Sequence, residues 1–328
     1  MKSIFMGGEK IFSVYSEAVQ KRLAQMCGAL PGRNFRAEEC AEFSDVEFIF
    51  STWGMPRFSA EEIRSYFPSL RAVFYAAGSV QGFARPFLDC GVRVFSAWAA
   101  NAIPVAAYTV SQILLAAKGF FPACRMMKSG ESKLAKKTAA AFPGNFGAKI
   151  GVLGAGQIGS LVISGLAFAK PAILVYDPFL SAQRADALGV IRAELDEVFS
   201  VCDVVTNHLA NKPQTVGILN YALFSRMPDH AVFINTGRGA QVVEADLVRA
   251  FSECPERTAL LDVTMPEPPE KNHPFYRMEN VILTPHIAGS TGNELWRMGE
   301  YMMQEAERAK NGLPPRYEVT KEMLETMA

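Results

Sequence analysis

The stretch that decides the fold is Lys149–Ala169, KIGVLGAGQIGSLVISGLAFA. A short apolar run leads into a glycine-rich turn, and a second apolar run follows, a pattern typical of a strand, a tight turn and a helix. Gly154, Gly156 and Gly159 form the sequence GxGxxG. The first glycine permits a tight turn, the second lets the backbone approach a pyrophosphate, and the third lets helix and strand pack closely. We therefore expect a dinucleotide here, with its phosphates at the helix N-terminus, where free N–H groups favour anions.

The next apolar run along the chain, AILVYD, ends in Asp177. In dinucleotide-binding units, an acidic residue about 20 residues further on hydrogen-bonds the ribose hydroxyls. A carboxylate there would repel the 2′-phosphate of NADP, and no arginine follows at once, so the sequence favours NADH over NADPH. The alternative is that Asp177 merely caps a turn ahead of Pro178.

Apolar runs alternate with helical patterns on both sides of this stretch, which is typical of parallel β-α-β units. Between Lys149 and Pro285 the expected strands are KIGVLG, AILVYD, DVVTNHL, AVFINT, TALLDV and VILTP, a number that fits a doubly wound parallel sheet. The first hundred residues hold SIFMG, VEFIFST, RAVFYAA and VRVFS, enough for a smaller α/β layer. A long apolar helix is expected to start near Pro104, and a last helix near Asn293. The fold class is therefore α/β.

The composition excludes several classes of function. Of the 328 residues, 49% are hydrophobic and 20% charged, which suits one large or two medium domains with sizeable cores. The formal net charge is zero, with no dense basic stripe, so neither a nucleic acid nor an anionic membrane is an expected partner. The most apolar segment, residues 102–117, reads as too short and too polar to span a bilayer, and no signal peptide is evident. Six cysteines without a CxxC pair suggest free thiols, so we expect a soluble cytoplasmic protein.

Chemically capable residues follow three neighbouring strands of the second block. AVFINTGRG delivers Arg238, TALLDVTMPEPP delivers Asp262 and Glu267, and VILTPH delivers His286. Ligands of open α/β sheets bind beyond the carboxyl ends of the strands. An arginine, a carboxylate and a histidine at those ends form a workable site for reducing a 2-oxo acid.

Each residue type has a physical reason to be there. The planar fork of Arg238 matches a substrate carboxylate or carbonyl. The imidazole of His286 can exchange a proton near neutral pH, and Glu267 could hydrogen-bond the imidazolium until hydride transfer creates an alkoxide. Taken singly, an arginine after a strand is usually a surface ion-pairing residue, and a histidine near a proline is usually a loop residue.

The other histidines carry weaker signals. His208, in VVTNHLANKP, also ends a strand and either borders the cofactor or packs in the core. His230 and His273 lie in polar loops, where we expect them to be solvated. No histidine pair has metal-ligand spacing, so no metal is expected.

The motifs GVLGAGQIG, YDP, INTGRG, LDV…EP and TPHIAGST occur in the family order of the D-isomer-specific 2-hydroxyacid dehydrogenases, which include glyoxylate/hydroxypyruvate reductases, phosphoglycerate dehydrogenases and D-lactate dehydrogenases. The chain resembles this family over nearly its whole length. The resemblance implies a Rossmann NAD-binding domain over residues 102–291. A discontinuous, flavodoxin-like substrate domain would comprise residues 1–101 and 292–328. It also implies a homodimer joined through the cofactor domains.

The resemblance also implies roles for the residues. Arg238 would orient the substrate, His286 would be the acid/base, Glu267 its partner, and Asp262 would hold the nicotinamide side. The cofactor contacts are then expected from Gly154, Gly156, Gln157, Ile158, Gly159, Asp177, His208, Leu209, Thr236, Gly237, Arg238, Asp262, His286 and Gly289.

One loop of the first hundred residues, YAAGSV, resembles the family loop whose backbone N–H groups hold the substrate carboxylate. The residues in question are Ala77, Gly78 and Ser79. Asn101 matches a polar position at the domain hinge. With Arg238 and His286, these would be the substrate contacts.

Three hypotheses follow. The first is an NAD-dependent oxidoreductase that moves a hydride between the nicotinamide and C2 of a small D-2-hydroxy or 2-oxo acid. The second is a non-catalytic NAD-sensing or corepressor-like protein on the same scaffold. The third and less favoured is a formate dehydrogenase, because formate oxidation needs no proton transfer and would leave the pair Glu267–His286 without a task.

Overall fold

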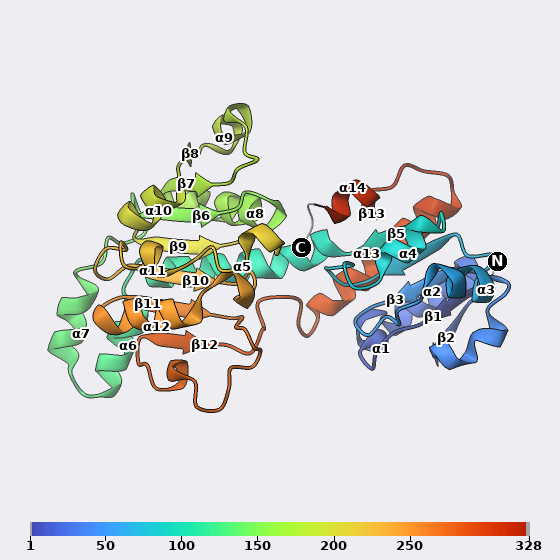
Figure 1. Ribbon diagram of the computed structural model, residues 1–328, viewed down its shortest axis with the longest axis horizontal. Coiled ribbons are helices and arrows are strands. Elements are labelled where there is room, and N and C mark those ends of the chain that lie inside the picture. The colour runs from blue at the N-terminus through green and yellow to red at the C-terminus, as the bar shows by residue number, and fades with distance from the viewer. Residues whose placement is uncertain (1, 326–328) are drawn as a thin grey trace. The chain divides into compact units, whose positions relative to one another are not determined.

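The computed structural model describes residues 2–325, and the chain divides into two compact units. One unit contains the chain up to Asn101 together with the chain from Ser290 onward, and the other is Ala102–Gly289. The second crossing falls two residues before the boundary expected from the sequence. Each unit has its own sheet, covered by helices (Figure 1).

The second unit is built on a seven-stranded sheet with the order β12-β11-β10-β9-β6-β7-β8, and every neighbouring pair is parallel. The strands are β6 (Lys149–Leu153), β7 (Ala172–Tyr176), β8 (Ile191–Arg192), β9 (Val204–Asn207), β10 (Val232–Asn235), β11 (Thr258–Leu261) and β12 (Val281–Leu283). The six predicted strands are all present. The sequence missed β8, because both of its residues are exposed and give no apolar run. The order reverses between β6 and β9, as in a doubly wound Rossmann sheet.

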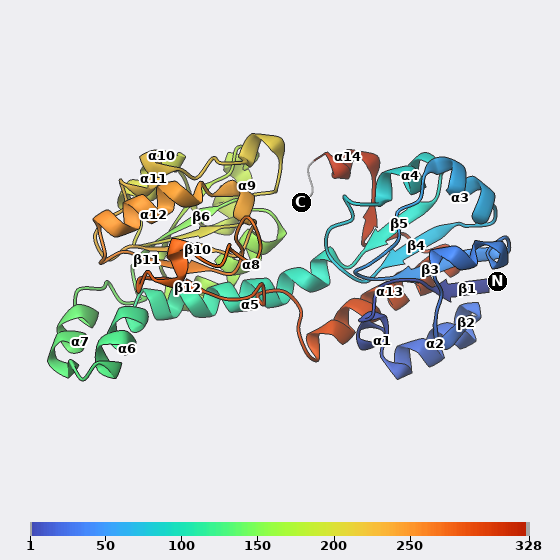
Figure 2. The same ribbon diagram turned by 60° about the horizontal axis from the view of Figure 1, so that its bottom comes forward.

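Helices cover both faces of this sheet, with α5 and α8 below it and α10 to α12 above it in Figure 2. The helices are α5 (Trp98–Ala116), α6 (Phe120–Lys128), α7 (Ser132–Ala139), α8 (Gln157–Leu166), α9 (Ala182–Leu188), α10 (Leu195–Val201), α11 (Tyr221–Phe224) and α12 (Glu244–Glu253). Side chains alternate between the two faces: Phe233 packs with α10, α11 and α12, whereas Val232 and Ile234 pack with α5, α8 and α9. Because both faces are buried, the strand reads as a continuous apolar run.

The prediction for α5 was wrong at its start. The helix begins at Trp98, so Pro104 lies within it, where its missing N–H removes one helical hydrogen bond. In residues 2–325, α5 is the helix that is long and apolar enough to cross a membrane, so its length no longer excludes a span. Half of its most apolar window is buried, and Ile113 and Ala116 are part of the core beneath the sheet, as expected of a core helix.

The first unit has a six-stranded sheet of order β13-β5-β4-β3-β1-β2, which is parallel except for the pair β13–β5. Its strands are β1 (Lys2–Phe5), β2 (Ala29–Asn34), β3 (Val46–Ser51), β4 (Ala72–Tyr75), β5 (Arg93–Ser96) and β13 (Glu318–Val319). β2 and β13 were not predicted, because ALPGRN is mostly exposed and β13 is only two residues long.

Two cores flank this sheet as well. One contains residues of α1 (Ile11–Val14), α2 (Glu17–Cys27) and α13 (Glu294–Lys310), and the other contains residues of α3 (Ala60–Tyr66), α4 (Ala84–Asp89) and α14 (Lys321–Leu324). The predicted last helix is confirmed, with Asn293 as its N-cap residue. Both units therefore have the α/β layers expected from the sequence.

Candidate active site

Most residues predicted for chemistry in the second unit come just after parallel strands, while Glu267 lies farther along the segment that follows β11. Because all neighbouring strands are parallel, their carboxyl ends meet at one edge of the sheet. The residues at that edge are Gly154 after β6, Asp177 after β7, His208 after β9, Thr236, Gly237 and Arg238 after β10, Asp262 after β11, and His286 shortly after β12.

The glycine turn between β6 and α8 has one open position. Gly154 has a φ of +89°, and a Cβ there would lie 2.8 Å from the carbonyl oxygen of His208. A Cβ on Gly159 would lie 2.0 Å from the Gly154 oxygen. A Cβ on Gly156, in contrast, would meet nothing within 4 Å, and Gly156 and Gln157 are exposed at the start of α8. The first and third glycines are therefore required by packing, whereas the second leaves an open cradle that suits a pyrophosphate. Ile158 follows, partly buried, within the first turn of the helix.

Asp177 is bound to the same turn. One carboxylate oxygen accepts from the N–H of Ala155 at 2.8 Å, and the other accepts from the N–H of Phe179, also at 2.8 Å. Each oxygen keeps a lone pair for a ribose hydroxyl. Arg184 was not predicted; its guanidinium donates to the Ala155 carbonyl at 2.8 Å and thereby brings a cation to the turn.

The ring of His208 has one bonded and one unbonded nitrogen. Its Nε2 lies 3.0 Å from the hydroxyl of Thr206, while its Nδ1 is buried without a partner among the described residues. Burial lowers the pKa of His208 to about 3, so the ring is neutral. Such an orphaned ring nitrogen is compatible with either reading of His208 made from the sequence.

A buried amide cluster, missed by the sequence reasoning, holds the loop that carries Arg238. Asn207 donates to both Asn235 and Gln241, at 3.0 and 2.7 Å. Gln241 in turn accepts from the backbone N–H of Arg238 and donates to the carbonyl of Leu209. The available signal was an asparagine at the end of two strands and a glutamine in a glycine-rich loop. These amides fix the loops after β9 and β10 relative to each other.

The side chain of Arg238 is partly buried and donates to the carbonyl of Gly237 at 2.7 Å. Burial lowers the pKa of Arg238, and the nearby carboxylate of Glu267 acts in the opposite direction. A guanidinium has five N–H groups, so most remain available to a ligand. Thr236, before it, exchanges a hydrogen bond with Thr109 of α5 at 3.1 Å.

The imidazole of His286 meets the carboxylate of Glu267. Nδ1 of His286 lies 2.6 Å from Oε1 of Glu267, and the two side chains are 49% and 42% exposed. Since Nδ1 is engaged, Nε2 is the nitrogen left for a substrate. The pair is accessible to solvent and close enough for a strong hydrogen bond.

Asp262 orders the backbone that carries His286. His286 has a φ of +54°, an uncommon conformation for a residue with a side chain. The buried carboxylate of Asp262 accepts from the N–H groups of Ile287 and Ala288, both at 2.9 Å, and from the hydroxyl of Thr284 at 2.6 Å. The contact of Asp262 with a nicotinamide stays a prediction, while its bonds to this loop are direct.

Thr284 links the loop to α5 through Tyr108. The Tyr108 hydroxyl lies 3.0 Å from the Thr284 hydroxyl. Burial raises the pKa of Tyr108, so the phenol stays neutral and can donate. Nothing in the sequence marked Tyr108, because its partner follows far along the chain.

One expectation for a histidine was wrong. His273, expected in solvent, has a side chain only 18% exposed and lies 3.3 Å from the carboxylate of Glu244. The pairing was hidden in the sequence because the two residues belong to different elements.

The predicted substrate loop belongs to the first unit. Ala77 is buried, Gly78 is partly buried and Ser79 is exposed. Ser96 donates to the carbonyls of Ala77 and Gly78. Within residues 2–325, no acceptor bonds the backbone N–H of Gly78 or of Ser79. Asn101 accepts from the N–H of Ser290 at 2.9 Å, and its amide nitrogen lies near Gly78. Gly289 ends the second unit at this crossing.

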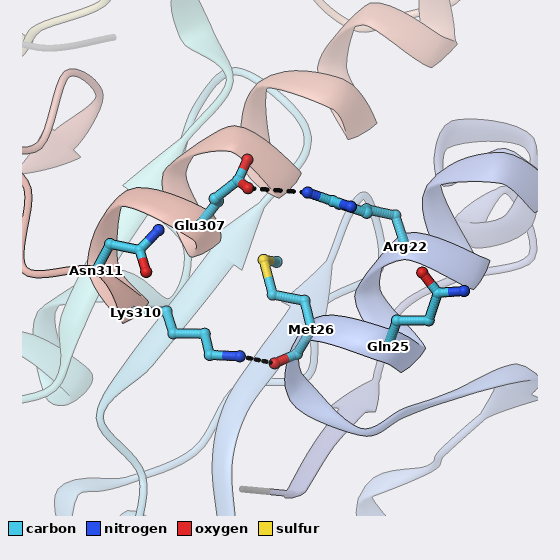
Figure 3. Close-up of a pocket in the computed structure, with 6 residues that line it drawn as sticks. All are labelled: Arg22, Gln25, Met26, Glu307, Lys310 and Asn311. Carbon is cyan, nitrogen blue, oxygen red and sulfur yellow. Dashed lines mark hydrogen bonds and ion pairs between the residues drawn. The ribbon is translucent and has the colours of Figure 1, made fainter.

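A separate pocket lies in the first unit, between α2 and α13 (Figure 3). Its polar groups largely satisfy one another: Arg22 pairs with Glu307 at 3.1 Å, and Lys310 donates to the carbonyl of Met26. The pocket is lined by Arg22, Gln25, Met26, Glu307, Lys310 and Asn311. It offers no acid–base pair, so the strand ends remain the candidate site.

Comparisons with known proteins identify the family. Residues 110–288, more than half of the chain, match the model of the D-isomer specific 2-hydroxyacid dehydrogenase NAD binding domain. D-3-phosphoglycerate dehydrogenase of Archaeoglobus fulgidus is 31% identical over 226 residues, which are 69% of this chain and 42% of that protein. The chain thus spans less than half the length of this curated relative.

Two solved structures share the fold. D-mandelate dehydrogenase of Rhodotorula graminis superposes with a TM-score of 0.82 at 19% identity, covering 97% of each chain. A phosphoglycerate oxidoreductase from Rhizobium etli gives 0.81 at 22% identity, covering 98% of this chain and 99% of its own. The family model, the ordered motifs and the fold together show that the chain belongs to the D-isomer specific 2-hydroxyacid dehydrogenases.

Proposed function

We propose that this protein is an NAD-dependent D-2-hydroxyacid dehydrogenase that interconverts a small 2-oxo acid and the corresponding D-2-hydroxy acid. The observation that carries the proposal is the 2.6 Å pair of His286 and Glu267, near the partly buried Arg238 on the same sheet edge as the glycine turn. A packing role alone would not require a solvent-accessible acid–base pair.

The second unit fits the dinucleotide. Gly156 leaves an open cradle at the N-terminus of α8, and Asp177 presents two carboxylate oxygens beside it. A bound nicotinamide supplies or accepts the hydride. The preference for NADH rests on Asp177, which would repel a 2′-phosphate, whereas Arg184 at the same turn favours an anion. We propose that the carboxylate decides, because it lies on the residue that follows β7 directly.

The side chains of this chain supply the remaining steps of reduction. Arg238 binds the carboxylate or carbonyl of the substrate through its free N–H groups. As the carbonyl carbon gains a hydride, the oxygen gains a proton from Nε2 of His286, and C=O becomes CH–OH. Glu267 accepts from Nδ1 throughout and stabilises the imidazolium before transfer. In oxidation, the same nitrogen takes the hydroxyl proton.

The unbonded N–H groups of Gly78 and Ser79 support the proposal that the loop of residues 77–79 binds the substrate carboxylate, with Asn101 beside it.

We also propose a cytoplasmic homodimer. The five described cysteines without a disulfide suit a reducing compartment, and the exposed Met127 and Leu134 on α6 and α7 suit a subunit contact. Sedimentation velocity at micromolar concentration tests the dimer, and a monomer would contradict it.

A substrate screen tests the proposed function. Oxidation of NADH or NADPH is followed with glyoxylate, hydroxypyruvate, pyruvate, 3-phosphohydroxypyruvate and bulkier 2-oxo acids, and formate is tested with NAD⁺. We expect turnover with at least one oxo acid, faster with NADH, and none with formate. Tight NADH binding without any turnover would favour the non-catalytic sensor instead, and turnover of formate alone would favour a formate dehydrogenase.

A further inference from the structure

Glu244, the first residue of α12, is bound to both ends of the segment that carries Glu267. Its Oε1 accepts from the backbone N–H of Met265 at 2.8 Å, and its Oε2 lies 3.3 Å from Nε2 of His273. The side chains of Glu244 and His273 are only 12% and 18% exposed, so water competes weakly for these contacts. Glu267 lies between the two anchored residues and carries the carboxylate that meets His286.

The tautomer of His273 can be assigned from its other partner. Nδ1 of His273 accepts from the backbone N–H of Phe275 at 3.3 Å, so the proton is on Nε2 and points at Glu244. The Phe275 ring is buried in the core and lies edge-on against His273, with ring centroids 4.3 Å apart. Through His273, the segment that carries Glu267 contacts the buried core of the second unit.

Both partners of Glu244 are donors, and this requires a carboxylate. Two separate oxygens must accept, one from Met265 and one from His273. A glutamine of the same shape offers one acceptor and one donor, so one of the two contacts would become a donor facing a donor. Burial raises the pKa of Glu244, and the hydrogen bond from the Met265 N–H opposes that rise.

We propose that Glu244 is a positioning residue, which holds the segment Met265–His273 so that Glu267 meets the imidazole of His286. Glu244 touches neither substrate nor the reacting atoms and acts through Glu267. The inference deepens the proposed function and rests on it. A displacement of about 1 Å at a catalytic group can cost up to roughly a hundredfold in rate, so a loosened segment should lower turnover.

The test uses four variants of the full chain. E244Q keeps shape but loses one acceptor. H273Q keeps a donor near the position of Nε2, and H273A removes both ring contacts. E253Q, at the other end of α12, is the matched control, because Glu253 is an exposed carboxylate that bonds Arg249 and Tyr221. Steady-state kinetics with the best oxo acid are combined with NADH binding and with amide hydrogen exchange of the peptide covering residues 263–275.

We expect E244Q to lower kcat by about tenfold or more, with KM and the NADH dissociation constant within about twofold of the parent. Exchange in residues 263–275 should accelerate in E244Q and H273A. H273Q should retain most of the turnover lost in H273A, and E253Q should behave as the parent. Parent-like kcat in E244Q, or a loss of kcat with no faster exchange in this segment, would overturn the proposal.

The exchange measurement needs no substrate. If the parent protein turns over none of the oxo acids, the proposed function fails, while exchange still decides whether Glu244 orders the segment. If the parent turns over and E244Q leaves both turnover and exchange unchanged, the function stands and the role of Glu244 is wrong.

Discussion

The two halves of the candidate site are built in different ways. The glycine turn is formed by one contiguous stretch of the chain. Its backbone N–H groups and the space left by a missing side chain, as at Gly156, form the proposed phosphate site. The acid–base cluster is formed by side chains from three loops, Arg238, Glu267 and His286, and the backbone of each loop donates to a buried or partly buried side chain. Under the proposed function, cofactor binding would depend on local backbone geometry, whereas turnover would depend on a tertiary hydrogen-bond network.

The largest effect is expected at the acid–base cluster. H286A removes the proton donor and should lower kcat by about 10² to 10⁴-fold. Because the glycine turn is not touched, the NADH dissociation constant, measured by fluorescence titration, should stay near that of the parent. Unchanged turnover would remove His286 from the mechanism, and a lost affinity for NADH would show that the two halves are not separable.

The complementary change belongs to the glycine turn. G156A places a methyl group in the open cradle and should weaken NADH binding by roughly 10 to 100-fold, as expected for losing backbone hydrogen bonds to a charged group. The stability cost should be about 1 kcal/mol or less, since Gly156 is an N-cap with a negative φ and free space. G159A is the matched control: its Cβ would lie 2.0 Å from the Gly154 oxygen, so it should destabilise the fold. Equal loss of stability in both variants would contradict the inference that packing requires Gly159 but leaves Gly156 open.

The smallest effect concerns His208, where the two halves adjoin. Burial lowers its pKa from 6.5 to about 3, so the folded protein keeps it neutral while the unfolded chain gains a proton below about pH 6.5. The stability is therefore full above pH 6.5 and falls as the pH drops toward 3, by at most about 1.4 kcal/mol per pH unit from this group. H208Q should flatten that slope in urea unfolding between pH 7 and pH 4.5. An identical slope in parent and variant would mean that the ring is not buried in solution.

Sequence reasoning succeeded where local pattern carries the information. The six strands from Lys149 to Pro285 and the last helix after Asn293 are present, because apolar periodicity and capping residues report directly on burial. It failed at β8, which is exposed on both residues, and at the start of α5. A proline favours a first helical turn, but the alanine-rich residues that precede Pro104 are also helical, so the helix starts six residues earlier, at Trp98.

The sequence by itself determined the α/β layers, the dinucleotide turn and the identity of the residues at the strand ends, because parallel strands bring their carboxyl ends to one edge whatever the loops do. Only the tertiary structure decided that Glu267 reaches His286 and that Asp262 holds the loop of His286. It also decided that Glu244 contacts both Met265 and His273, at the two ends of the segment that carries Glu267. The reason is physical: strand and helix periodicity is local along the chain, whereas hydrogen bonds between side chains depend on distances that only folding sets.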